Sequence, residues 1–273
     1  MPDAYTSAIL AIVFYLTATV WLLRRPGNSG PMLGYSTLHP VRLGLAWAGM
    51  LFHCVALVRL MLTPVGVDLS FFSTAALVSL MVVLLFLLAT IDKPVDKLGG
   101  AVLPMAAVTL TLRLAFPNEV HILTDLTSTM QAHILVSILA FSLLNIAALQ
   151  ALLLTCQDFQ LHRKRTNWFV RSLPPLETME AILFQMIGVG FLLLSLSLAS
   201  GFLFVEDLFA QHLVHKTVLS ILSWLVFGIL LWGRWHFGWR GRTAVRWTLL
   251  GFAVLMLAYF GSKLVLEIIL RRT

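Results

Sequence analysis

Charged residues and cysteines are both scarce in this chain. Of its 273 residues only 11% are Asp, Glu, Lys or Arg, whereas an average soluble domain carries about 25%. Apolar residues make up 59%, which is more than a soluble fold of this length can hide beneath a polar surface. The shortage of charge therefore excludes an ordinary soluble domain and favours a protein dissolved in lipid.

The two cysteines, Cys54 and Cys156, lie in no CxxC or CxxCH motif, which excludes a haem-attachment or thiol-redox motif. We expect both to be small buried apolar residues without a disulfide. The sequence also lacks a Gly-rich phosphate loop, HExxH, GxSxG and an acidic pair inside an apolar run. The net charge of +7 comes without a basic groove interleaved with aromatics, so no nucleic-acid partner is expected.

Long apolar runs are what the chain does contain. A helix needs about 20 apolar residues to cross the hydrocarbon core, and eight runs reach that order of length. They cover residues 5–23, 42–62, 70–90, 98–116, 130–155, 181–205, 214–232 and 245–270. No internal repeat or domain boundary interrupts them. The sequence predicts an all-α membrane protein, a bundle of about eight transmembrane helices forming a single integral membrane domain over residues 1–273.

Basic residues gather in alternate loops. The loops after the first, third, fifth and seventh runs hold 13 of the 19 lysines and arginines. The opposite loops carry the acids Asp68, Glu119, Asp125, Glu206 and Asp207. Because basic loops stay on the cytoplasmic side, we expect a multi-pass protein with both termini outside, although Arg271 and Arg272 oppose this. No Lys or Arg precedes the first run, so we expect a retained helix there and not a cleaved signal.

Histidine placement is the remaining chemical signal. The predicted topology puts His39, His162 and His236 inside, among basic residues, and puts His121, His133, His212 and His215 outside. The inner three are expected to meet solvent or lipid headgroups. The outer four either form a metal or haem site on facing helices or are polar aromatic residues at the membrane interface. Haem fits better than zinc, because no Cys or close acid accompanies them.

Two polar features fall inside apolar runs. His53 lies 11 residues beyond Arg42, roughly 16 Å into the bilayer at the helical rise. Polar groups at that depth usually have a partner or a role, so His53 is either a packed hydrogen-bonding residue or a haem ligand or relay. Lys263 and Glu267 are four residues apart near the outer end of the last run, and we expect a structural ion pair.

Three segments of the second half of the chain carry more information than their hydropathy: HILVSILAFSLL (133–144), LPPLETMEAILFQMIGVGFLLLSLSLASG (173–201) and HKTVLSILSWLVFGILLWGRWHFGWRGRTAVRWTLLGFAVLMLAYFGSK (215–263). They resemble segments of cytochrome c assembly proteins of the CcsA and CcmC type, and most closely those of the YpjD and HemX-like branch. The resemblance is strongest over residues 130–273. It implies a haem-handling membrane protein of a bacterial-type inner (plasma) membrane, in contact with the lipid bilayer and with other cytochrome c biogenesis or membrane proteins.

In that family, haem is presented outside the membrane between two outward histidines and under a tryptophan-rich loop. His133 matches the first histidine. The tryptophan-rich segment is replaced here by residues 202–224, where Trp224 and Lys216 persist, and residues 264–270 hold no second histidine. His215 and His212 are our own inferred substitutes, with His53 as the further candidate. The resemblance therefore implies an accessory role and not a full synthase. A scaffold or regulatory subunit without haem is the alternative, and a small-solute transporter is the third.

Overall fold

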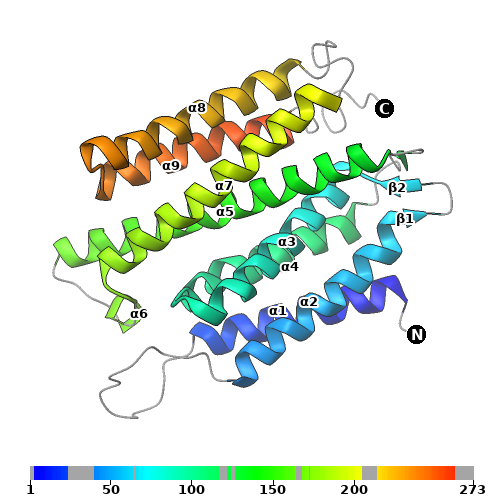
Figure 1. Cartoon of the computed structure of the whole chain (residues 1–273). Helices are drawn as coiled ribbons and strands as arrows, with labels where there is room; N and C mark the ends of the chain where they lie inside the picture. Colours follow the sequence, from blue (N-terminus) through cyan, green and yellow to red (C-terminus); the bar gives the residue numbers. More distant parts are fainter. Residues whose placement is uncertain are drawn as a thin grey trace. The chain divides into compact units, whose positions relative to one another are not determined.

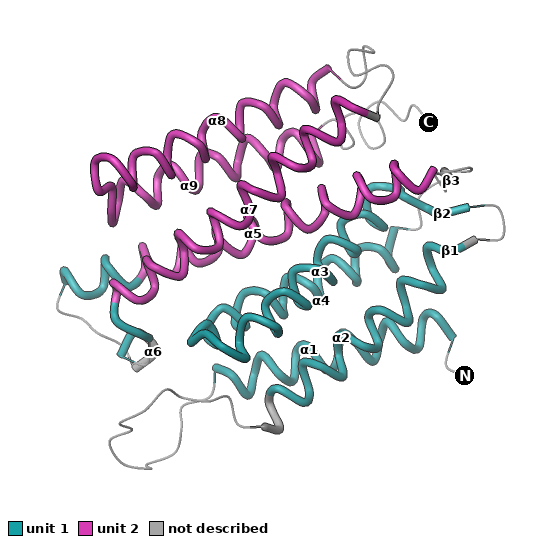
Figure 2. Tube along the Cα trace, viewed as in Figure 1, with its two compact units in different colours: residues 1–124, 157–175 teal, residues 125–156, 176–273 magenta. Residues whose placement is uncertain are grey.

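The computed structural model describes residues 3–23, 40–63, 66–116, 122–123, 127–163, 168–171, 173–204 and 214–261. These residues divide into two compact units. Unit 1 comprises residues 1–124 and 157–175, and unit 2 comprises residues 125–156 and 176–273 (Figure 2). Each unit is described below by itself. The prediction of one integral membrane domain over the whole chain stays a prediction.

The described residues form nine α-helices (Figure 1). They are α1 (Ala4–Leu23), α2 (Pro40–Met61), α3 (Phe71–Asp92), α4 (Gly99–Ala115), α5 (Ser128–His162), α6 (Trp168–Arg171), α7 (Leu176–Phe204), α8 (Val214–Phe237) and α9 (Gly241–Met256). A short turn of helix, Asp96–Leu98, leads into α4, and a π-helical turn, Leu257–Gly261, extends α9. All of them except α6, taken with these extensions, are long and apolar enough to cross a membrane.

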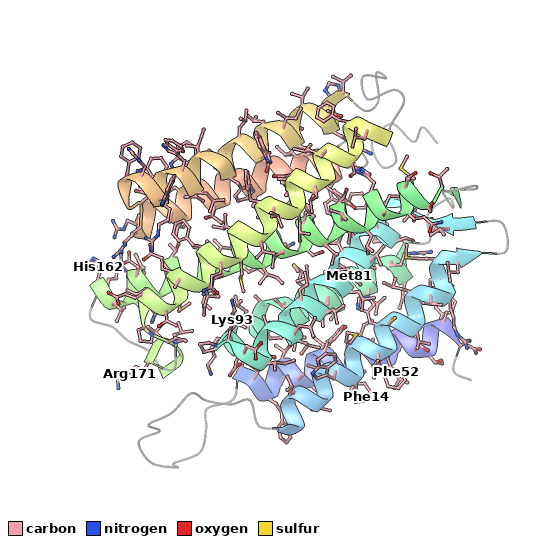
Figure 3. The ribbon with its side chains drawn as sticks, in the orientation of Figure 1. Phe14, Phe52, Met81, Lys93, His162 and Arg171 are labelled. Atoms are coloured by element: carbon pink, nitrogen blue, oxygen red, sulfur yellow. The ribbon has the colours of Figure 1, made fainter. Side chains whose placement is uncertain are left out.

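Unit 1 is built on α1, which packs against α2 and α4, while α3 packs against α4 and α2. Phe14 and Phe52 stack face to face across the first pair, with ring centroids 5.6 Å apart (Figure 3). Small residues allow this close packing: Ala8, Ala11 and Ala56 form one buried cluster with Leu110 of α4. Burying such apolar contact between helices excludes lipid and fixes their spacing.

A small antiparallel sheet lies where α2 and α4 end and α3 begins. Its strands are β1 (Leu62–Thr63), β2 (Gly66–Asp68) and β3 (Ile122–Leu123), in the order β1-β2-β3. Leu62 pairs with Val67, and Val67 pairs in turn with Leu123. The hydropathy pattern did not predict these strands, since two or three residues are too few to show an alternating pattern.

Unit 2 contains α7, α8, α9 and most of α5, and α8 packs against both α7 and α9. Phe141 of α5 meets Phe252, Tyr259 and Phe260, with ring centroids between 4.9 and 5.6 Å apart. The link from α8 to α9 is short: only Gly238, Trp239 and Arg240 lie between the helices. Gly238 and Gly241 have φ angles of 66° and 54°, a region that favours glycine.

The prediction of an all-α membrane protein with eight spanning helices is confirmed. Several boundaries differ from the prediction. The fifth helix continues to His162, the seventh to Phe237, and the eighth begins at Gly241 and not at residue 245. Polar and aromatic residues at the membrane surface lower the hydropathy there but do not end a helix. The prediction that the cysteines are buried is wrong: Cys54 and Cys156 are both exposed and free, as small apolar residues on lipid-facing helix surfaces can be.

Candidate functional site

His133 is held between two helices of unit 2. It lies half-buried near the start of α5, and its Nδ1 is 2.8 Å from Oγ of Ser200, near the end of α7. The Ser200 hydroxyl donates its hydrogen to the backbone oxygen of Ser197, at 2.9 Å. Because that hydroxyl has a single hydrogen, we assign Ser200 as the acceptor from His133, an assignment that places the ring hydrogen on Nδ1 and the lone pair of a neutral ring on Nε2.

A second hydroxyl contact braces the same helix pair one turn deeper. Ser137 donates to the backbone oxygen of His133 at 2.7 Å, and its Oγ lies 2.7 Å from Oγ of Ser197. The ring of His133 is therefore held to α7 by Ser200, and the Ser137–Ser197 contact joins the same two helices one turn further along. Histidines that bind metals almost always donate their other N–H to a protein acceptor, and His133 has this arrangement with Nε2 left for a ligand.

Of the other histidines predicted to lie outside, the structure describes His215 alone. His215 is exposed in the first turn of α8 and makes no hydrogen bond or ring contact with His133. His212 and His121 lie outside the described residues, as do Lys263 and Glu267 with their predicted ion pair. Among the residues that the structure describes, no group of three or more His, Cys, Asp or Glu could hold a metal ion.

Trp224, which persists from the family's tryptophan-rich pattern, is used for packing. Its ring stacks on Phe191 of α7, with centroids 5.4 Å apart, and its Nε1 donates to Oγ of Ser195 at 2.8 Å. Both contacts join α8 to α7 in the interior of unit 2. The indole is therefore committed to the helix pair and is not a free platform for a ligand.

His53 belongs to unit 1, where it is completely buried beside Tyr15 of α1. The Tyr15 hydroxyl lies 3.2 Å from Nδ1 of His53, and the two rings meet edge to face. Nε2 of His53 is buried without a hydrogen-bond partner in the described part of the chain. The hydrogen bond at Nδ1 agrees with the interpretation of His53 as a packed hydrogen-bonding residue. Nε2 remains able to bind a ligand or a water molecule.

Sequence reasoning missed a buried ion pair in unit 1. Arg113 of α4 reaches Asp68 of β2, with side chains 11% and 2% exposed. Asp68 was expected to be a loop acid, and Arg113 lay unremarked inside the fourth apolar run. An arginine in an apolar run signals a buried partner, and the acid 45 residues earlier at the same predicted membrane surface was the available one.

Two of the histidines predicted to lie inside are described by the structure, and both are exposed. His162 is exposed and bonds its own helix, with Nδ1 2.9 Å from the backbone oxygen of Asp158. His236 is exposed and stacks on Trp232. His39 falls outside the described residues. His162 and His236 are thus surface residues. His162 can serve as a control for substitutions of His133, because both histidines lie in α5.

Comparison with known proteins finds relatives that are similar to this chain over nearly its full length. The family described as Cytochrome C assembly protein matches residues 45–270. Inner membrane protein YpjD of Escherichia coli (strain K12) is 33% identical over 264 residues, which cover 96% of this chain and 98% of that protein. Cytochrome c biogenesis protein CcsA of Chlamydomonas reinhardtii is 26% identical over 186 residues, covering 63% of this chain and 50% of that protein. No solved structure matches significantly.

Proposed function

The chain belongs to the cytochrome c assembly protein family, and we propose that it is a haem-handling accessory protein of that process in the inner membrane. The general part of this function, a role related to cytochrome c biogenesis by a multi-pass inner-membrane protein, follows from the family and from the eight apolar helices. Haem handling and accessory status are the finer parts, and they depend on the residues of unit 2.

The observation that carries the proposal is the anchored ring of His133. With Ser200 accepting the Nδ1 hydrogen, the lone pair of Nε2 would be the group with which His133 could hold haem iron. The residue begins a rigid helix that is braced a second time through Ser137. Because the ring is fixed before any ligand arrives, little ordering entropy opposes binding.

His215 or His212 would supply a second imidazole to the iron. His215 is exposed at the start of α8 and is thus accessible, and both residues lie on the same predicted side of the membrane as His133. When bound, haem would supply the redox-active iron centre. The chain's own part is to present imidazole nitrogens and to keep the ring of His133 in one tautomer.

Accessory status is supported by what the site lacks. Trp224 is committed to Phe191 and Ser195, and the rest of the segment 202–224 contains no tryptophan. A protein that both holds haem and delivers it to apocytochrome needs a surface to present the porphyrin. We therefore place this chain as a holder or partner of haem-handling proteins and not as a synthase.

The test is the absorbance of the full chain purified in mild detergent from cells supplied with haem. We expect a Soret band that shifts on reduction, and His133→Ala should lower the haem-to-protein ratio several-fold at unchanged expression. His162→Ala is the matched control, since its ring is exposed and bonds only its own helix. Full haem retention in His133→Ala would reject His133 as a ligand, and His53 would be tested next.

A colourless wild-type protein would reject haem handling. It would favour the alternative of a scaffold or regulatory subunit, provided that a stable partner copurifies. Altered solute uptake in vesicles would instead favour the transporter. The absorbance spectrum thus separates the proposal from both alternatives with one preparation.

A further inference from the structure

The α8–α9 turn of unit 2 is closed by a residue from α7. Oε1 of Glu180 accepts the backbone N–H of Gly241 at 2.8 Å and lies 3.7 Å from Nη1 of Arg234. Arg234 also donates to the backbone oxygen of Trp239 at 3.1 Å. Its guanidinium lies over the ring of Phe184, 4.5 Å from the centroid. One carboxylate and one guanidinium therefore neutralise each other inside the turn.

Trp239 completes the closure. Its ring covers Gly233, where an added Cβ would clash with it, and it stacks on Trp247 of α9 with centroids 5.5 Å apart. Its backbone N–H donates to the oxygen of Gly233. The turn is thus a rigid structure, and the side chains that point out of it are held in place.

Those outward side chains are large aromatics and arginines. Trp232, Trp235 and Phe237 are 57%, 83% and 67% exposed, and Arg240 and Arg246 are exposed as well. We call these five residues the aromatic–arginine surface. All of them lie within two helical turns of the α8–α9 turn, a band roughly 10 Å high along the helix axes.

The charge on this surface is of one sign. Glu180 is neutralised by Arg234. Glu177, one turn before Glu180, is the exposed acid nearest to it along α7. The two exposed arginines of the aromatic–arginine surface, Arg240 and Arg246, therefore favour an anionic partner.

The exposed face of the rest of α8 favours a lipid over a soluble molecule as the partner. Its exposed apolar residues are Val218, Leu222, Leu225, Ile229 and Trp232. Their spacing of four, three, four and three residues puts them on one face of the helix. That face is apolar over roughly 21 Å and then ends in tryptophan and arginine, as lipid-facing helices do where acyl chains give way to headgroups.

We propose that the aromatic–arginine surface binds the phosphate headgroup of an anionic phospholipid. The tryptophans and Phe237 lie at the level of the glycerol and carbonyl groups, and Arg240 and Arg246 contact the phosphate. The band of roughly 10 Å is comparable with one interfacial layer of a bilayer. This binding is independent of the haem proposal, because none of its residues belongs to the His133 site.

The test is native mass spectrometry of the full chain in detergent, titrated with phosphatidylglycerol and, separately, with phosphatidylcholine of the same acyl chains. We expect tighter binding of phosphatidylglycerol. Arg240→Gln should reduce that affinity about fivefold, and the double variant Arg240→Gln/Arg246→Gln about thirtyfold. Trp235→Leu should weaken both lipids to the same degree, since it removes an interfacial anchor and no charge.

The control is Arg163→Gln/Arg171→Gln, which removes two exposed arginines from unit 1 and should keep the preference for phosphatidylglycerol. Equal binding of the two lipids by the wild type would overturn the proposal, and so would an equal loss in the control. A protein partner that copurifies and masks the lipid effect would also overturn it, since the surface would then be a protein interface. Gel filtration of each variant confirms that it is folded.

Discussion

Nη2 of Arg113 lies 3.2 Å from Oδ2 of Asp68, joining α4 to β2 across 45 residues of sequence. Ser73 stands between the charges, accepting from Nε of Arg113 at 2.7 Å and donating to Oδ2 of Asp68 at 2.7 Å. The backbone N–H of Ser70 donates to the other carboxylate oxygen. Each charge is thus paired and hydrogen-bonded, which is the condition under which burial is tolerated.

Replacing Arg113 with Met should strongly destabilise unit 1. The change keeps the side-chain length but leaves Asp68 buried without a cation, which costs about 3–5 kcal/mol. The thermal unfolding midpoint in detergent measures the effect. Arg163→Met is the control, since Arg163 is exposed just after α5 and lies over Phe159 of that helix, and its loss should shift the midpoint little. If Asp68→Leu in the Arg113→Met background recovers no stability, the two residues are not coupled.

Tyr15→Phe should destabilise the α1–α2 pair through His53. The change removes the hydroxyl that bonds Nδ1 of His53. Nε2 of this completely buried ring has no hydrogen-bond partner in the described part of the chain, so both nitrogens would then be unpaired, at a cost of about 1–3 kcal/mol. Tyr5→Phe is the control on the same helix, because Tyr5 is exposed. The thermal unfolding midpoints of the two variants measure the effect, and Tyr15→Phe should have the lower one. Equal midpoints would mean that the Tyr15–His53 hydrogen bond adds no stability.

Gly49→Ala and Gly44→Ala should shift stability in opposite directions, although both glycines lie in α2. An added Cβ at Gly49 would come within 2.8 Å of Cδ1 of the buried Tyr15 ring, whereas nothing lies within 4 Å at Gly44. The first change forces the ring to move, at a cost of about 1–3 kcal/mol. The second gains helix propensity, about 0.5–1 kcal/mol. Matching shifts in chemical denaturation would contradict the close packing at Gly49.

Ser200→Ala should weaken haem binding without touching the iron ligand. The ring of His133 loses the acceptor that fixes its tautomer, and loss of such a support typically lowers metal affinity 10–100-fold. Haem titration monitored at the Soret band gives the affinity. Ser200→Thr keeps the hydroxyl and should restore binding, while Ser195→Ala removes a hydroxyl that bonds Trp224 instead and should leave the affinity near that of the wild type.

The predicted orientation can be checked with reporter fusions. Fusions after Leu161 and after Gly238 should report the cytoplasm, and a fusion after Gln211 should report the outside. The reason is the concentration of 13 of the 19 basic residues in alternate loops. Reversed reporter activities would reject the placement of both termini outside, and would move His133 to the cytoplasmic face.

Hydropathy was sufficient to predict the helices but not how they meet. Each span is a long apolar run, and that signal is local. The Arg113–Asp68 pair joins residues 45 positions apart. A single arginine changes the mean hydropathy of the fourth apolar run too little to identify its partner. The anchoring of His133 by Ser200 depends on 67 residues of separation, and serines are common enough in apolar helices that none stands out. His133 itself was found through its position at a helix start and through family resemblance.

The three-residue turn between α8 and α9 shows the same limit. The sequence predicted a longer polar loop there, since Arg234, Trp235 and His236 lower the hydropathy. In the structure these residues remain helical, because the last turn of a membrane helix lies among headgroups where polar and aromatic side chains are favourable. The sequence shows the glycines at positions 238 and 241. It does not show that Glu180, about 60 residues before Gly241, accepts the backbone N–H of that glycine.

The packing of Trp239 on Gly233 means that this turn should not tolerate a change of length. Surface loops usually accept insertions, because their ends are free to move. One extra residue here would break the Trp239–Gly233 packing that fixes where α9 begins, and would shift Phe252 and Tyr259 relative to Phe141 of α5. A loop on the membrane surface thus determines which side chains fill the middle of the bundle, and relatives of this chain should vary in length elsewhere.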